Sequence, residues 1–554
     1  MTLGMIVAAL LARDTASARA QAATERRALG IVVIGSYADE RLRLMQLVGD
    51  TSLGSPFRSV STLNGRVHDS TRAHSLGWRL SSPELLFTQN SELPYSLNDG
   101  ALWAGRGANA SILAGAVADW GRARLFLLPE LTYSENRFYP LVDPTYALNP
   151  AILPARDTFS SPWHQGPQSI DLPLRFGAIP FWRLFPGQSS LVIDAGRNVA
   201  VGASTENEWW GPGIRNALIL SNNAPGFPHA FARPAHPVTT RWGTFDARWL
   251  AGWLTESFFF DANSTNATRS ISMAGLSWQP PRTTLVLGAA RSVFAPVRSR
   301  GAAMTHVLDF LADVGHPNAR PMSDSTMTPG RDQLLSLFFR WVQPNDRFEF
   351  YGEWGRAEFP VSLRDFLVQP NHTQAYTLGL QWLGEPLRWD ARLRAQGEVS
   401  FLEQSTTFRT RPIGSWYTSR AVEQGYTNQG QVLGAAIGPG SSSQFVALDL
   451  VAPRWQIGPY LTRIRWLEDA HSQQPYVYDA LGEHGLCEHD VSLLHGVRAA
   501  GDTRFGQLQL DYSTGWRLNV FFENPGPCFF PRPGFPARDV RNKSFSLRFT
   551  PAAF

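Results

Sequence analysis

Alternation of apolar and polar residues is the clearest pattern in the chain, and it is strongest from residue 333 onward. In the first such stretch every second residue is large and apolar: Leu335, Leu337, Phe339 and Trp341. Ser336 and Arg340 lie between them. Because successive side chains of a strand point to opposite faces, this period of two predicts a strand with one apolar and one polar face.

The next strands repeat this two-faced pattern. The return strand has apolar Phe348, Phe350 and Trp354 on one face and Arg347, Glu349, Tyr351 and Glu353 on the other. The following hairpin has an apolar face of Tyr376, Leu378, Leu380, Trp382, Leu387, Trp389, Ala391 and Leu393. Its second strand carries Arg388, Asp390, Arg392 and Arg394 on the opposite face. Mixed charges on facing strands favour pairing within a barrel lumen, although they could also line a channel.

The connections between these strands alternate in length from residue 333 to the end. Short turns are predicted near 343–346, 384–386, 452–454 and 501–503, and long loops near 358–372, 402–443, 468–490 and 523–542. Outer-membrane barrels have short periplasmic turns and long extracellular loops, with aromatic residues at the strand ends. We therefore predict an all-β fold, a transmembrane antiparallel β-barrel.

The number of strands follows from counting backward through the chain. Further strands are predicted at 271–278, 283–294, 244–255, 189–201 and 122–133, for a total of 14 to 18. The last strand places Phe545, Leu547 and Phe549 opposite Ser544, Ser546 and Arg548, and the sequence ends on Phe554. An aromatic C-terminal strand resembles the signal by which the barrel-assembly machinery selects its clients, although Pro551 departs from that pattern.

Composition agrees with a wall between lipid and water. Charged residues make up 17% of the chain, against about 25% in ordinary soluble proteins, whereas aromatic residues reach 12% with 19 tryptophans. No window approaches the roughly 18 consecutive apolar residues of a membrane-spanning helix. The net charge is only +4 and the arginines are scattered, so we expect no nucleic-acid partner.

The N-terminal region is predicted to contain a signal peptide and one helix. An apolar run at 3–12 is followed by small-x-small sites at 18–20 and 20–22, which predicts a signal peptide over 1–22, although the usual positive charge at its start is missing. The pattern at 38–49 predicts an amphipathic helix within a short periplasmic segment, 23–75, before the barrel at 76–554. Cys487 and Cys528 fall in predicted long loops that flank one pair of strands, so a disulfide between them is geometrically reasonable.

One motif identifies a family resemblance. Residues 206–231 read ENEWWGPGIRNALILSNNAPGFPHAF, which resembles the WWGPG…LILSNNA signature of the capsule assembly Wzi family of outer-membrane proteins. Four further stretches agree in the same order: NDGALWAGRG at 98–107, YGEWGRAEF at 351–359, AYTLGLQW at 375–382 and GYTNQGQVLG at 425–434.

The resemblance implies a particular fold and function. It implies a barrel of about 18 strands with a plugged lumen, acting as a surface lectin that attaches capsular or exopolysaccharide to the cell and not as the export channel. Well-known members carry a longer helical bundle before the barrel, whereas here only 38–49 has a helical pattern. The expected partners are this polysaccharide, outer-membrane lipid and the barrel-assembly machinery, for a monomer in the outer membrane of a Gram-negative cell.

Two groups of residues are candidates for glycan binding, because aromatic faces pack against sugar rings and amides bond their hydroxyls. The first group lies in the motif: Trp209, Trp210, Asn216, Asn222 and Asn223. A Gly-Pro-Gly turn among tryptophans also suits a lumen plug, and we favour that interpretation for this group. The second group lies in the long loop 402–443, where we expect exposed side chains that bind glycan or pack loop against loop: Trp416, Tyr417, Tyr426, Asn428 and Gln429.

Two alternatives to a lectin remain at this point. A diffusion porin or solute channel would use the inward-facing charges. Paired carboxylates also catalyse glycoside hydrolysis, and Glu206 and Glu208 lie two residues apart, but such spacing is common in loops. The sequence has no metal-ligand spacing, no nucleophile elbow and no cofactor motif, so we expect no enzyme.

Overall fold

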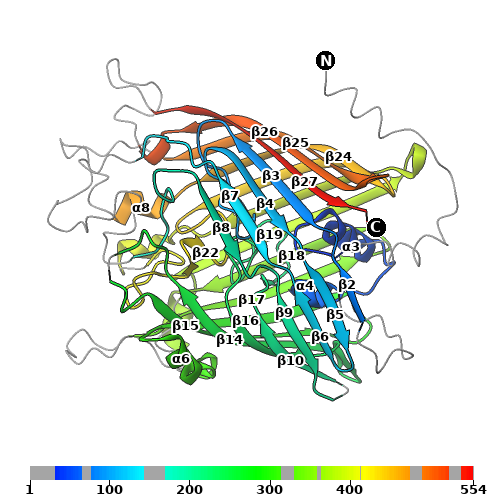
Figure 1. Cartoon of the computed structure of the whole chain (residues 1–554), viewed down its shortest axis with the longest axis horizontal. Coiled ribbons are helices and arrows are strands. Elements are labelled where there is room, and N and C mark those ends of the chain that lie inside the picture. The colour runs from blue at the N-terminus through cyan, green and yellow to red at the C-terminus, as the bar shows by residue number, and fades with distance from the viewer. Residues whose placement is uncertain are drawn as a thin grey trace.

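The computed structural model describes residues 31–64, 77–141, 169–196, 198–261, 263–312, 330–357, 363–411, 414–473, 489–522 and 538–552. Their strands form one closed antiparallel barrel (Figure 1). The last strand, β27 (Val540–Pro551), closes the ring by pairing with β3 (Glu84–Asn90). A closed ring pairs the backbone groups of every strand, which a wall in contact with lipid requires.

The ring of described residues contains 18 positions, and the strand or pair of strand segments that fills each position is called a stave below. Five staves consist of two strand segments separated by a short break, each pair lying against the same neighbouring staves. These are β2 (Gly77–Leu80) with β3, β4 (Gly107–Leu113) with β5 (Ala116–Trp120), β6 (Ala123–Leu127) with β7 (Glu130–Ser134), β8 (Phe181–Phe185) with β9 (Ser190–Asp194), and β12 (His229–Pro234) with β13 (Val238–Thr240). The predicted barrel of about 18 strands is confirmed.

The other thirteen staves are single strands, most of them longer. Besides β27 they are β10 (Val199–Ser204), β14 (Gly243–Thr255), β15 (Thr268–Gln279), β16 (Leu285–Val297), β17 (Asp332–Gln343), β18 (Phe348–Arg356), β19 (Gln374–Pro386), β20 (Arg392–Phe401), β23 (Ser442–Val451), β24 (Trp455–Arg465), β25 (Val491–Thr503) and β26 (Gly506–Leu518). Neighbours along the chain are neighbours in the ring, so the barrel is a simple meander.

The outer face of the wall is apolar, as the alternation predicts. On β17 the outward-facing Leu337 and Trp341 are exposed, whereas the inward-facing Phe338 and Val342 are buried. Exposed tryptophans gather near the ends of the staves: Trp78, Trp120, Trp242, Trp278, Trp341, Trp382 and Trp389 toward the short turns, and Trp182 and Trp516 toward the long loops. This distribution is typical of the aromatic girdles of membrane barrels.

Short and long connections alternate around the whole ring, but some boundaries were predicted wrongly. Strand β19 runs on to Pro386 through a bulge at Leu383, so the turn lies at 387–391 and not at 384–386. Arg388 and Asp390 are therefore exposed in that turn and do not face the lumen. Likewise, β25 continues to Thr503, which places its turn at 504–505. The predicted strand 189–201 is a hairpin of β9 and β10, because Gly196 turns the chain with φ +89°.

The N-terminal residues 31–64 lie inside the barrel at the end of the short turns (Figure 1). The predicted helix is α3 (Tyr37–Leu47), which begins after the cap Ser36; a second short helix, α4 (Val60–Leu63), follows β1 (Phe57–Arg58). Leu47 packs with Val342 and Leu383 from inner wall positions near the turns. One turn before Leu47 on α3, Arg43 forms an ion pair with Glu349 of β18 at 2.5 Å. Apolar packing and buried charge pairing thus fix this segment to the wall.

Short helices occur in the long connections, together with two small strand pairs inside the lumen. The helices are α6 (Arg300–Ala303), η3 (Met304–His306), η4 (Asp309–Leu311), α7 (Leu363–Val368), η6 (Thr406–Arg409), α8 (Glu468–Gln473) and η8 (Val520–Phe522), with η5 (Arg388–Asp390) in a short turn. The small strands are β1 with β11 (Trp209–Trp210) and β21 (Thr427–Asn428) with β22 (Gln431–Val432). In the part of the chain that the structure describes, no helix has the length and apolarity needed to cross a membrane.

Two predictions fall outside the described residues. The signal peptide over 1–22 lies there, and so do both cysteines, Cys487 and Cys528. The signal peptide, the domain boundaries and the disulfide therefore stay predictions.

A buried carboxyl group joins two of the long loops. Asp469 of α8 accepts hydrogen bonds from the Gln404 backbone N–H at 2.8 Å and the Ser415 hydroxyl at 2.6 Å. The side chain is 3% exposed. Burial raises the pKa of Asp469 to about 7, and the nearby Glu403 and Glu468 carboxylates add to this shift. The loop 402–441 is thus attached to its neighbour through a group that titrates near neutral pH.

We predict that this loop contact weakens as the pH rises. The folded pKa lies above the ordinary value of 3.8, so the contact is strongest below pH 4 and loses stability until about pH 7. One pKa unit corresponds to about 1.4 kcal/mol, so opening should increase on the order of ten-fold or more between pH 5 and pH 8. Hydrogen exchange of residues 402–418, corrected for the chemical rate, measures this opening. Asp469→Asn should remove the pH dependence, and an unchanged profile in that variant would refute the assignment.

Candidate functional site

The connection between β10 and β12, residues 205–228, lies inside the barrel and is called the plug below. Its strand β11 pairs with β1 of the N-terminal segment, with Trp210 opposite Phe57. A Gly-Pro-Gly turn follows, in which Gly211 has φ +111°. A Cβ atom on Gly213 would lie 2.1 Å from the Asn216 carbonyl oxygen. Only glycine allows the chain to fold back this closely, which explains the unusual motif.

The two tryptophans of the motif are buried in different surroundings. The Trp210 ring packs edge-on against Phe57, with ring centroids 5.2 Å apart. Trp209 donates from Nε1 to the Gly213 carbonyl at 3.0 Å, and the Arg58 guanidinium lies 5.6 Å from its ring centroid. Both side chains are at most 3% exposed. The preferred interpretation of this pair as part of a lumen plug agrees with these contacts.

A carboxylate of the barrel wall binds the turn that follows Gly213. Glu398 of β20 accepts the backbone N–H groups of three consecutive plug residues, at 2.7 Å from Ile214, 3.0 Å from Arg215 and 2.8 Å from Asn216. The Tyr351 hydroxyl of β18 donates to the same carboxylate at 2.8 Å. Charge-assisted bonds of this kind are stronger than neutral ones, and these satisfy backbone donors that have no strand partner.

A second wall carboxylate binds the next part of the plug. Glu353 of β18 accepts from the Leu218 N–H at 3.0 Å and from the Ser336 hydroxyl of β17 at 2.6 Å. Asn216 adds a side-chain bond to Ser443 of β23 at 3.3 Å. Strands β18, β20 and β23, which lie close together in the ring, therefore position residues 214–218.

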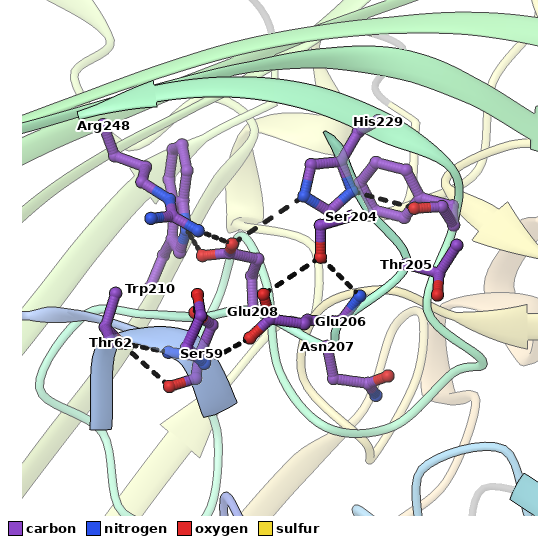
Figure 2. A network of polar contacts seen from close by, with 12 residues as sticks. Ser59, Thr62, Ser204, Thr205, Glu206, Asn207, Glu208, Trp210, His229 and Arg248 are labelled. Atoms are coloured by element: carbon purple, nitrogen blue, oxygen red, sulfur yellow. Dashed lines mark hydrogen bonds and ion pairs between the residues drawn. The ribbon is translucent and has the colours of Figure 1, made fainter. Parts of the chain in front are cut away.

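Glu206 and Glu208 belong to a separate network at the start of the plug (Figure 2). Glu208 forms an ion pair with Arg248 of β14 and accepts from the Trp210 indole at 3.1 Å. Its carboxylate lies 3.8 Å from His229 Nε2. Glu206 accepts from the Ser61 backbone N–H and from Ser204. Both carboxylates are buried and engaged in the packing of the plug, which gives the hydrolase alternative no support.

Three stretches that carry the family resemblance meet at the end of the plug. The Gly100 N–H donates to the Asn222 carbonyl at 2.8 Å, and the Asn222 side chain donates back to the Asn98 carbonyl at 3.1 Å. On the other side, the Asn223 side chain donates to the Val432 carbonyl at 3.0 Å. Segments that are more than 100 residues apart in sequence therefore form one hydrogen-bonded unit.

The loop 402–441 folds into this unit and does not expose its aromatic residues. Trp416, Tyr417, Tyr426 and Asn428 are at most 2% exposed, and Gln429 is half-buried. The expectation of exposed aromatic side chains on this loop is wrong, because they pack in the hydrophobic core that the loop shares with the plug. A direct role in glycan binding stays a prediction for all ten candidate residues.

Tyr417 shows how the loop and the plug are connected. Its hydroxyl donates to the Leu218 carbonyl of the plug at 2.8 Å and accepts from the Ala435 N–H at 2.8 Å. The Tyr417 and Tyr426 rings stack with centroids 5.9 Å apart. Asn428 adds bonds to the Thr255 N–H at 3.1 Å and the Pro225 carbonyl at 3.0 Å. The loop thus covers the plug on the side of the long loops.

The inward-facing charges of the wall mostly form pairs. Glu349 pairs with Arg340 at 2.8 Å as well as with Arg43, and Arg394 pairs with Asp449 at 2.7 Å. One cavity of about 300 Å³ remains beside the plug, lined by polar groups that include Arg215, Asn222, Tyr460, Arg498, Asp511 and Arg548. The lumen is thus largely filled by protein, with polar space left along one wall.

The most important anchor, Glu398, was missed in the sequence. The period-two pattern that identified Arg392 and Arg394 continues through Gln396 to Glu398, so alternation alone places Glu398 on the same strand as inward-facing residues. Nothing in the sequence indicates that it binds backbone N–H groups of a segment almost 200 residues earlier. Extending the alternation from Arg394 through Gln396 to Glu398 would have identified the residue as inward-facing but not its role.

We predict that Glu398→Gln destabilises the protein by about 1–3 kcal/mol, since buried N–H groups lose a charged acceptor. The midpoint of thermal unfolding in detergent, followed by tryptophan fluorescence, should fall. Glu385→Gln is the matched control, because the Glu385 side chain is 75% exposed near the end of β19. Equal midpoints for Glu398→Gln and the wild type would contradict the proposed anchor.

Comparisons with solved structures return membrane barrels with little sequence identity. Wzi from Escherichia coli, described as a carbohydrate-binding β-barrel of group 1 capsule assembly, is 11% identical, with 85% of each chain covered and a TM-score of 0.49. Pseudomonas aeruginosa OccK2 is 10% identical over 86% of this chain and 96% of that one, with a TM-score of 0.35. A mutant porin of Rh. blastica is 7% identical over 86% and 99%, with a TM-score of 0.30.

The comparison of sequences is more specific. No curated protein sequence matches the chain as a relative. A family model does match, over a region that runs from β9 to β23 and includes the plug and the loop that covers it. Residues 192–449 match the model of the capsule assembly protein Wzi family, as the WWGPG motif predicted.

Proposed function

We propose that this protein attaches capsular or exopolysaccharide to the surface of a Gram-negative cell, with the long loops facing outward. The observation that carries the proposal is the position of the matched motifs. They form the plug and its covering loop, which fill the lumen just below the long-loop end. This arrangement favours a closed platform that binds a ligand over an open passage.

The candidate residues have a supporting role in this proposal. Their buried side chains keep the plug and the loop 402–441 in one conformation, so that the surface above them presents its backbone and side chains in a fixed arrangement. Binding to a rigid surface avoids the entropic cost of ordering it. We further propose that the protein is a monomer that the barrel-assembly machinery inserts.

We predict that the purified protein retains the surface polysaccharide of the strain that produces it. Tyr417→Phe should weaken retention several-fold, because the lost hydroxyl joins the plug to the loop. Tyr512→Phe on the exposed outer wall is the matched control and should bind as the wild type does. The measurement is retention of labelled polysaccharide on immobilised full-length protein. Absence of binding to any surface polysaccharide of the producer would refute the proposed function.

A diffusion porin is the second candidate, and the cavity of about 300 Å³ beside the plug is the observation that favours it. If the protein is a lectin, we predict no single-channel conductance in planar bilayers that contain it, because paired charges and the plug fill the lumen. Stable single-channel conductance from the wild type would favour the porin instead. Replacing residues 205–228 by a short linker gives the comparison variant, whose conductance should rise because the plug no longer occupies the lumen.

A further inference from the structure

Two arginines face outward from the barrel wall, where lipid is expected. On β16 the inward side is occupied by Ala290, Ser292 and Phe294, so Arg291 points to the outside. On β18, Arg356 lies on the same face as Trp354 and opposite Gln374, a position that also points outward. Arg291 is 9% exposed and Arg356 is 2% exposed. A bare cation on the lipid face of a barrel is unfavourable, so each requires a cover.

The cover of Arg291 is the helical segment 299–312, which follows β16. The Arg291 guanidinium donates to the carbonyl of Phe310 at 2.5 Å and to that of Ala312 at 2.7 Å. Two more outward-facing residues bond the same segment, since Trp249 donates to the Val307 carbonyl at 3.1 Å and Ser272 at 2.8 Å. The segment therefore lies flat against the outer wall over β14–β16, where Figure 1 shows α6 outside the ring.

The cover of Arg356 is α7, from a neighbouring hairpin. Asp365 of this helix lies 3.9 Å from the Arg356 guanidinium, and the Phe366 ring packs edge-on against Trp354 at 6.3 Å. Two separate loops thus fold outward over the wall of β14–β18. In contrast, the plug and the loop 402–441 fold inward.

Both covers present apolar side chains to the outside. The six residues are between 50% and 73% exposed: Met304, Leu308, Leu311, Leu363, Leu367 and Val368. Leu276, Leu287 and Leu337 are exposed on the strands of the same wall. The covers therefore continue the lipid-facing surface beyond the strands.

Exposed cations accompany these apolar residues. Arg298 lies directly before the first cover, Arg300 lies in α6, and Arg364 lies in α7. Among the described residues, no carboxylate forms an ion pair with any of the three. One acidic residue of each cover is engaged elsewhere, Asp309 with His306 at 2.8 Å and Asp365 with Arg411 at 2.7 Å. In the part of the chain that the structure describes, the surface is thus apolar and carries positive charge that no carboxylate pairs with.

We propose that the two covers form a binding surface for a phosphate-bearing glycolipid of the outer leaflet. The acyl chains would pack against the six apolar residues, and Arg298, Arg300 and Arg364 would bind the phosphates through charge-assisted hydrogen bonds. The surface lies on the long-loop side of the barrel, which is the side of the outer leaflet. This proposal does not depend on the proposed binding of polysaccharide at the long-loop end.

A second copy of the chain fits the surface less well. It would bring the same three arginines and, among the described residues, no carboxylate that pairs with them, so like charges would approach each other across the contact. A glycolipid supplies both the apolar and the anionic complement in one molecule.

The test is lipid binding to the full-length protein, measured by native mass spectrometry from detergent with added bisphosphorylated lipid A. Replacing the three arginines by alanine should lower bound lipid A about ten-fold or more, whereas replacing them by lysine should keep most of the binding. The matched control replaces Arg241, Arg388 and Arg504, three exposed arginines of the short turns, and should bind as the wild type does.

Three results would overturn the proposal. The first is equal binding of lipid A by the wild type and the alanine variant, both folded by heat-modifiable mobility. The second is equal arginine-dependent binding of phosphatidylglycerol and lipid A, which would assign the surface to a glycerophospholipid. The third is a dimer that disappears in the alanine variant or in Leu308→Ser with Leu367→Ser, which would assign it to a second copy. Weaker, arginine-independent binding of lipid A without phosphates would support it.

Discussion

Unpaired backbone donors inside the lumen are the constraint on which the structure depends. Residues 211–218 lie in the middle of a barrel and form no regular strand, yet a buried N–H without an acceptor costs about 1–3 kcal/mol. Glu398 accepts three of these donors and Glu353 accepts a fourth. Without such acceptors the plug would need water around its backbone, and the lumen would have to be wider and wetter. The wall carboxylates therefore decide whether the barrel is filled or open.

The same requirement explains where the charged residues of the wall are found. A carboxylate inside the barrel can bind the plug, whereas an arginine on the outside has only lipid unless the chain covers it. Glu349 and Glu398 face inward and are engaged by the N-terminal segment and the plug, respectively. Arg291 and Arg356 face outward and are each covered by their own loop. Long connections thus complete the wall on both of its faces.

The second half of the barrel could be predicted well because its strands are long and regular. The strands of the first half were harder to predict. Breaks at residues such as Pro129 divide them into short segments, in which too few residues alternate to identify a strand. Turn positions were wrong where local geometry intervened, as with the bulge after Leu383. The motif was correctly connected with a plug, but the exposure of Tyr417 and Tyr426 was wrong. Loop residues bury their aromatic rings only when a distant partner exists, and alternation contains no information on that partner.

The plug also limits what the remaining cavity can do. Arg215 and Asn222 of the plug line the cavity together with wall residues such as Asp511, and the same plug residues are fixed by Glu398 and by the Asn98 stretch. Movement that opened the cavity toward the long loops would therefore break bonds to the wall and to the loop 402–441 at the same time. A passage used for rapid diffusion gains nothing from such coupling. A surface that has to hold a large polymer does, because rigidity below the surface limits the entropy lost on binding.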